Sequence, residues 1–182
     1  GYTATIAADY TESAYSWGAA IIRQLTDSAI GLSSFENSVN DFRASDGNVD
    51  EFDIIESTQA DIHGTRRIGE SNQINGRIGY IQQDYEETLR DEKTYFAQAG
   101  YAYTVNPRLT LGTNARYEDS KFPDDPEDLE QKDTVIDLFA NYRFSENLSS
   151  RFMIGREHRD SSAANGDYTD NYALISVQYQ FY

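Results

Sequence analysis

The chain has 182 residues, a length that suits one domain, and carries a formal net charge of −16 from 31 acidic and 15 basic side chains. A nucleic-acid partner is therefore not expected, because a phosphate backbone requires Lys and Arg. No apolar run reaches the roughly 18 residues of a membrane-spanning helix, and the mean hydropathy is −0.69, which excludes such a helix but not a transmembrane β-barrel, whose strands are only half apolar.

Aromatic residues are the most informative part of the composition. The chain contains 14 Tyr, 9 Phe and one Trp, and Tyr combines an apolar ring with a polar hydroxyl. Two girdles of such residues border the apolar band of membrane β-barrels, although soluble β-proteins can also be rich in Tyr. The chain begins at Gly1 and not at an initiator Met, so we expect a processed form or a fragment.

Alternation of apolar and polar residues, interrupted by turn-forming residues, predicts about ten strands in an up-and-down order. Asn, Asp, Ser and Pro mark tight turns at 25–28, 105–108 and 144–148, and a looser turn is expected at 69–72. The predicted strands are residues 2–10, 15–25, 29–37, 51–63, 73–83, 94–104, 109–118, 134–144, 148–158 and 171–182.

The remaining connections are longer, polar and acidic. They cover residues 38–50, 84–93, 119–133 and 159–170. Every second connection of an up-and-down sheet lies on the same side. Short turns on one side and long acidic loops on the other are typical of outer-membrane barrels, whose periplasmic turns are short. An even number of strands would place both ends of the chain on the periplasmic side.

One face of most predicted strands is apolar, with Tyr at the ends and Ile, Leu or Ala in the middle, whereas the apolar faces of 29–37 and 51–63 fade. The last predicted strand is the clearest example. Its apolar residues are Ala173, Ile175, Val177, Tyr179 and Phe181. This segment resembles the closing strand of a bacterial outer-membrane β-barrel, and the resemblance implies that Tyr179 and Phe181 form the recognition signal for barrel assembly.

The opposite face is polar, and we predict that its charged residues line a lumen. These lumen-lining residues are Arg77, Arg116, Asp137, Arg143, Arg151 and Glu157. As a ladder, the arginines could attract an anionic solute or polysaccharide. Alternatively, the inward acids neutralise them and plug a ten-stranded barrel. A third arrangement, a soluble antiparallel barrel, would place the apolar face inside and leave the charges in water.

We predict no catalytic residue, metal site or cofactor. His158 with Glu157 and Ser161 or Ser162 contains the residue types of a hydrolase site, but the sequence shows no oriented triad. The acidic segment 118–133 offers oxygen atoms to Ca²⁺, but it lacks the Asp-x-Asp-x-Asp-Gly spacing of a calcium loop. The absence of cysteine excludes disulfides and cysteine-based metal sites.

Three segments carry a resemblance to a known family: Tyr103–Gly112, Asn141–Leu148, and the end of the chain from Arg159 to Phe181. Through them the chain resembles the β-barrel porin type 2 family of outer-membrane proteins, which includes members associated with exosortase and exopolysaccharide systems. The likeness is clearest over residues 94–182. It implies a bacterial outer-membrane location and an envelope-embedded conduit. Family members look longer than this chain, which suggests the C-terminal part of a larger barrel or a shortened relative.

We therefore expect an all-β protein, with residues 1–182 forming a single antiparallel, up-and-down transmembrane β-barrel domain. Its expected role is that of a passive conduit or of the membrane component of an envelope export assembly, with exopolysaccharide as one cargo. The alternative is a closed structural barrel that anchors a complex or displays acidic extracellular loops; an outer-membrane enzyme ranks last. Expected partners are outer-membrane lipid and lipopolysaccharide, the barrel-assembly machinery and, for an exporter, periplasmic export proteins.

Overall fold

The computed structural model describes residues 1–27, 54–86, 91–123, 129–163 and 166–180. These residues form one antiparallel sheet of nine strands. The strands are β1 (Tyr2–Thr11), β2 (Tyr15–Asp27), β3 (Ile54–Ile68), β4 (Asn72–Tyr85), β5 (Glu92–Asn106), β6 (Leu109–Lys121), β7 (Glu130–Arg143), β8 (Leu148–Ser161) and β9 (Tyr168–Tyr179).

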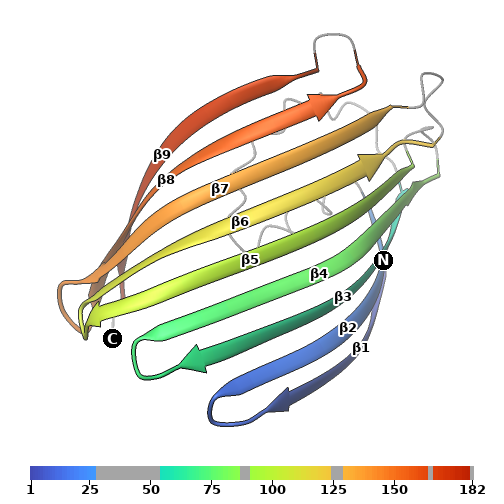
Figure 1. The fold of residues 1–182 in the computed structure, drawn as a ribbon. Coiled ribbons are helices and arrows are strands. Elements are labelled where there is room, and N and C mark those ends of the chain that lie inside the picture. The colour runs from blue at the N-terminus through green and yellow to red at the C-terminus, as the bar shows by residue number, and fades with distance from the viewer. Residues whose placement is uncertain (28–53, 87–90, 124–128, 164–165, 181–182) are drawn as a thin grey trace.

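The strands lie side by side in chain order, in a sheet that curves so that both edges turn away from the viewer of Figure 1. Each strand pairs with the next one along the chain. β1 and β9 make no contact with each other and are the free edges of the described sheet. The structure is thus an up-and-down sheet with the curvature of a partial barrel, as the strand pattern predicts.

Connections of two kinds alternate along the chain, as expected. Short turns at one end of the sheet, the short-turn end, are residues 12–14, 69–71, 107–108 and 144–147. At the other end of the sheet, the long-loop end, consecutive strands are further apart in the chain: β2 ends at Asp27 and β3 begins at Ile54, and six to eight residues separate the later pairs there.

The tight turn predicted at 25–28 is wrong over its described residues. Residues 25–27 belong to β2, and their pairing with β3 continues as far as Asp27 opposite Ile54. The first hairpin turns at residues 12–14, between the strands predicted at 2–10 and 15–25, and the Glu12 amide donates a hydrogen bond there to the Tyr15 carbonyl at 2.8 Å. Backbone pairing to a neighbouring strand therefore overrides the turn preference of Thr and Asp.

The direction of the edge strands differs from the prediction as well. β1 begins at the long-loop end and β9 finishes at the short-turn end, so the two edge strands run in the same direction (Figure 1). Placing both ends of the chain on one side is therefore wrong; the strand predicted at 29–37 lies outside the described residues. Antiparallel pairing at both free edges requires an odd number of further strands, because β1 and β9 are parallel to each other.

Several strands extend further toward the long loops than predicted. β6 ends at Lys121 and β7 begins at Glu130, and these two side chains form an ion pair at 2.9 Å. Much of the acidic segment 119–133 is consequently strand and not loop. Side chains here are polar on both faces of the sheet, so the alternation that marks the rest of each strand is absent from the sequence, although the backbone pairing continues.

Large apolar side chains lie exposed on the convex face. Ile6 is 76% exposed and Ile175 is 72% exposed, whereas the buried hydrophobic residues among those described are only Phe96 and Met153. A water-soluble protein rarely exposes such a continuous apolar surface. The alternative of a soluble barrel with an apolar interior is therefore wrong, because the apolar side chains lie on the outer, convex face of the sheet.

β3, where the alternation in the sequence is weak, also exposes apolar side chains on the convex face, and it extends to Ile68, beyond its predicted end. Its exposed apolar side chains include Ile54, Ile62 and Ile68, and Ile62 lies opposite Ala19 of β2 and Ile78 of β4. The predicted bounds of 51–63 stop five residues short of the end of this strand, and Glu56 and Thr58 interrupt its apolar face between Ile54 and Ile62.

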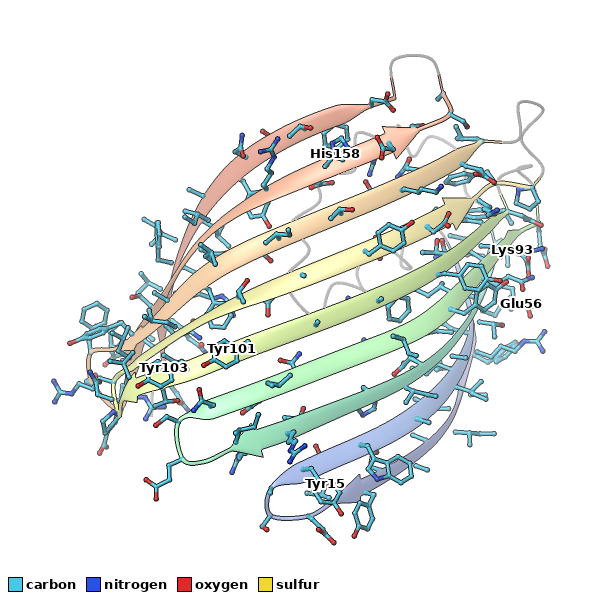
Figure 2. The ribbon with its side chains drawn as sticks, viewed as in Figure 1. Tyr15, Glu56, Lys93, Tyr101, Tyr103 and His158 are labelled. Carbon is cyan, nitrogen blue, oxygen red and sulfur yellow. The ribbon has the colours of Figure 1, made fainter. Side chains whose placement is uncertain are left out.

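Aromatic side chains border the apolar surface at both ends. Figure 2 shows Tyr15, Tyr101 and Tyr103 near the short-turn end, where Tyr10 also lies with its ring centroid 6.0 Å from that of Trp17. At the other border, the ring centroids of Tyr80 and Tyr95 are 4.9 Å apart. Tyr95 and Tyr103 lie about 27 Å apart along β5 at ~3.4 Å per residue, a separation that matches a lipid belt crossed by tilted strands.

A positive charge placed in the middle of this belt tests the assignment of faces. We expect Ile6→Lys to lower the free energy of unfolding by about 2–4 kcal/mol, because the ammonium would lie in hydrocarbon. Thr5→Lys is the matched control, since Thr5 is adjacent on the strand and points to the opposite face. Chemical denaturation in lipid vesicles measures both variants, and equal losses would contradict the assignment.

Candidate functional site: the polar concave face

All six predicted lumen-lining residues lie on the concave face, opposite the exposed apolar belt. Arg77 is on β4 and Arg116 is on β6; the others are Asp137 and Arg143 on β7, and Arg151 and Glu157 on β8. They do not form a single ladder of charges. The structure divides the arginines into some that contact a carboxylate and some that line a hollow.

The buried carboxylate of Asp61 organises the first group. Arg77 Nη2 lies 2.7 Å from Asp61 Oδ1, Gln59 Nε2 donates to the same atom at 3.1 Å, and His63 Nδ1 lies 3.1 Å from Asp61 Oδ2. The Asp61 side chain is only 2% exposed. This cluster was not predicted, although Gln59, Asp61 and His63 occupy every second position of β3 and therefore share one face.

His63 extends the same cluster across β2 to β1. His63 Nε2 lies 3.3 Å from Asp9 Oδ1 on β1. Gly18 lies directly between these residues in the register, and a Cβ atom there would come within 2.2 Å of Asp9 Oδ1. The absence of a side chain at Gly18 therefore allows a contact between strands that are not neighbours.

Two further concave arginines also contact carboxylates. Arg116 pairs with Glu118, and Arg159 Nε lies 2.7 Å from Asp133 Oδ1. The predicted acids have other partners: Asp137 accepts a hydrogen bond from the Tyr172 hydroxyl, and Glu157 Oε1 accepts one from Tyr168 at 2.5 Å. Charge neutralisation thus occurs on this face: Asp61, Glu118 and Asp133 contact the arginines directly, and Glu157 interacts electrostatically with Arg159.

A glycine opposite an aromatic residue recurs on the concave face. Phe96 lies opposite Gly79, and Phe139 lies opposite Gly112. A Cβ on Gly112 would come within 2.3 Å of the Phe139 ring, so the ring packs directly over the glycine. The Arg151 guanidinium lies 4.6 Å from the centroid of the Phe139 ring, within the range of a cation–π contact.

The second group of arginines lines a hollow at the short-turn end of β6–β9, with a volume of about 370 Å³. Arg108 of the β5–β6 turn contributes to it together with Arg143 and Arg151. Its remaining lining residues are polar or uncharged: Pro107, Thr110, Asn141, Tyr142, Ser149, Ser150, Ser176 and Gln178. No carboxylate lines this basic hollow, and neither Arg143 nor Arg151 has an ion-pair partner among the described residues.

The hydrolase constellation does not assemble. Glu157 and His158 are adjacent on β8 and therefore point to opposite faces. His158 lies on the convex face (Figure 2), with Nδ1 2.8 Å from Thr169 Oγ1 and Nε2 3.2 Å from Asp160 Oδ1. Ser162 Oγ accepts a hydrogen bond from the Glu130 amide.

The described part of the chain contains no cluster of three or more His, Cys, Asp or Glu side chains arranged to hold a metal ion. It also contains no helix long and apolar enough to cross a membrane. Residues 124–128 of the acidic segment lie outside the described residues.

Tyr179 ends β9 and is 53% exposed, whereas Phe181 lies outside the described residues. Their role as an assembly signal stays a prediction. At the first hairpin, the Tyr10 hydroxyl donates a hydrogen bond of 2.6 Å to Glu12 Oε1, which holds the pKa of the Glu12 carboxyl below its usual value.

The buried ion pairs should contribute more to stability than the exposed ones. We expect Arg159→Gln to lower the free energy of unfolding by about 3 kcal/mol, because it leaves the Asp133 carboxylate buried without its charged partner. Arg23→Gln removes an exposed arginine paired with Glu56 on the convex rim and should have little effect. Equal effects in urea titrations would refute this difference.

The close packing of the Phe139 ring on Gly112 predicts that a side chain at position 112 would destabilise the protein. Gly112→Ala should destabilise the protein by about 1–3 kcal/mol, because the new methyl group must displace the ring or the Tyr101 carbonyl, 2.5 Å away. Gly76→Ala is the control, since the nearest atom to its Cβ would be 3.7 Å away. Thermal unfolding of both variants measures the effect, and a neutral Gly112→Ala would show that the ring moves freely.

Comparison with known proteins agrees with this geometry. Residues 54–138 match the model of a family described as "Putative beta-barrel porin 2". The match begins earlier than the 94–182 expected from the sequence motifs and does not reach the last strand. No curated protein sequence matches the chain.

The fold is similar to that of solved outer-membrane proteins. A loop L8 deletion mutant of OmpT, an outer membrane protein of Vibrio cholerae, has a TM-score of 0.68 at 14% identity, with 98% of this chain and 53% of that chain covered. OmpT expressed in the outer membrane of Vibrio cholerae has a TM-score of 0.66 at 13% identity, with 98% of this chain and 56% of that chain covered. A deltaS2 mutant of the TodX monoaromatic hydrocarbon channel has a TM-score of 0.54 at 10% identity, with 98% of this chain and 60% of that chain covered.

The chain therefore spans little more than half the length of these structures. At such low identity the likeness concerns the fold. The family match and the exposed apolar belt indicate in addition that the protein is located in the outer membrane. The chain is a bacterial outer-membrane β-barrel protein with a porin-like fold, similar to the beta-barrel porin 2 family.

Proposed function

We propose that the chain forms part of the wall of a passive, water-filled conduit for polar solutes across the outer membrane. The observation that carries this proposal is the concave face. It is lined by charged and polar side chains, and the described residues bury only Phe96 and Met153 as hydrophobic residues. Such a surface requires water or polar solutes next to it, because an apolar filling would leave its charges unsolvated.

The width of the sheet supports an open lumen. Its nine strands do not close on themselves, and the chain covers 53–60% of the similar solved structures described above. A barrel of about 16 strands leaves an aqueous channel, whereas about eight strands leave only enough room for side chains. The ten-stranded plugged barrel is therefore the weaker alternative.

The plugged, structural barrel nevertheless has one observation in its favour. Side-chain contacts cross the concave face from β1 to β4 through Asp9, His63, Asp61 and Arg77. Such a network stiffens the wall, as an anchoring protein requires. Export of exopolysaccharide is the more specific form of the conduit proposal, and it rests only on the resemblance of the sequence to export-associated proteins.

The convex surface suggests the partners. We propose that the apolar belt contacts outer-membrane lipid and that lipopolysaccharide phosphates lie near the cationic residues of the long-loop rim, among them Lys93 and Lys121 (Figure 2 labels Lys93). The aromatic end of β9 would contact the barrel-assembly machinery. Periplasmic export proteins would approach the short-turn end.

Conductance separates the conduit from the structural barrel. The full-length protein, inserted into planar lipid bilayers, should produce stepwise increases in current, because an open polar lumen conducts ions. The same preparation denatured by heat is the control. Insertion without any steady current, with insertion verified by protection from protease in vesicles, would refute the conduit and support the structural barrel.

A further inference from the structure

We infer that the basic hollow at the short-turn end binds a carboxylated sugar, such as a hexuronate, at the periplasmic mouth of the conduit. The inference rests on the proposed function and specifies which polar solute the conduit would favour. The hollow combines three arginines with hydroxyl and amide side chains, and none of its lining residues is acidic.

The first step is the contrast between the arginines of the concave face. Arg77, Arg116 and Arg159 each contact a carboxylate of this chain. Arg143 and Arg151, in contrast, have no ion-pair partner among the described residues. Three arginines of this face thus have a carboxylate partner within the chain, whereas the two on β7 and β8 that line the hollow have none among the described residues.

The second step is the environment of Arg151. Its Nε atom is buried and has no hydrogen-bond partner among the described atoms. The aromatic ring of Phe139 lies against the guanidinium, and Gly112 leaves the space in which that ring packs. The charged group is thus held in position by packing and not by a counter-ion. A preorganised guanidinium of this kind matches the planar geometry of a carboxylate.

The third step concerns the uncharged lining. Thr110, Asn141, Ser149, Ser176 and Gln178 bring hydroxyl and amide groups from four adjacent strands to the hollow. Such groups donate and accept hydrogen bonds, as the hydroxyls of a sugar require. A simple inorganic anion would use only the arginines, so the mixed lining favours an anion that also carries hydroxyl groups.

The fourth step is size and place. A volume of about 370 Å³ lies within the range of about 300–1,000 Å³ for small-molecule sites. The hollow lies beside the 107–108 and 144–147 turns, which form the short-turn end. Because periplasmic turns are the short ones in outer-membrane barrels, this end faces the periplasm.

Equilibrium titration of the full-length protein in detergent tests the inference. D-galacturonate is the probe; D-galactose, which lacks the carboxylate, and inorganic phosphate, which lacks the sugar, are the comparisons. We expect galacturonate to bind more tightly than either. Arg151→Gln and Arg143→Gln should each weaken its binding about tenfold or more, because each removes a charge-assisted hydrogen bond.

Arg156→Gln is the matched control, because Arg156 is on β8 with Arg151 but points to the convex face. It should leave galacturonate binding unchanged. If Arg151→Gln fails to fold, as judged by heat-modifiable migration on gels, Arg143→Gln and Arg108→Gln still test the hollow. Equal binding of galactose, tighter binding of phosphate, or unchanged affinity in the folded arginine variants would overturn the inference.

Failure of the two proposals can be told apart in the same preparation. If the conduit conducts but galacturonate neither binds nor interrupts the current, the inference is wrong and the conduit stands. If galacturonate binds through Arg143 and Arg151 but no current flows, the binding site stands and the conduit is wrong. Interruptions of the current by galacturonate that disappear in Arg151→Gln support both.

Discussion

Pairing of the backbone between neighbouring strands is the constraint on which the rest of this structure depends. Within hydrocarbon, an unpaired amide or carbonyl group is too costly, so the strands must pair along their whole length. The pleat of each paired strand then sends successive side chains to opposite faces. Ile6 consequently lies in the lipid belt while its neighbour Thr5 lies on the polar side, and the same division holds around the sheet. Because the two free edges run in the same direction, this constraint also governs how the sheet can be completed.

The concave face shows how a polar surface of this kind distributes charge. Around Asp61 and along β6–β8, carboxylates of the chain lie against arginines, and buried hydrogen bonds offset the loss of hydration. At the short-turn end the arginines are held by ring packing and backbone position without such acids. Along the described concave face, acids of the chain thus partner Arg77, Arg116 and Arg159, whereas the hollow at the short-turn end has an excess of positive charge because no acidic residue lines it. That local excess contrasts with the net charge of −16 of the whole chain.

The sequence predicted the alternation of faces well, because an apolar belt with aromatic borders leaves a period of two in each strand. It was less successful where both faces become polar. The strand residues beyond Glu118 and before Asp133 were taken for loop, although Lys121 and Glu130 pair across the sheet. Turn preferences also misled at 25–28, because pairing with β3 holds those residues in a strand. The Asp61 cluster was missed because its charged partners Arg77 and Asp9 lie on other strands and reach Asp61 and His63 only through the register.

The sequence by itself determined the class of the protein: an up-and-down sheet, apolar and Tyr-bordered on one face and charged on the other, with turns of unequal length at its two ends. These features are local, and each follows from the spacing of a few neighbouring residues. Only the tertiary structure decided which charges meet. Arg77 faces Asp61 and Arg151 faces Phe139 because the strand register places them on adjacent strands. No local pattern reports that register, since hydrogen bonds between strands join backbone groups that are alike in every residue except proline.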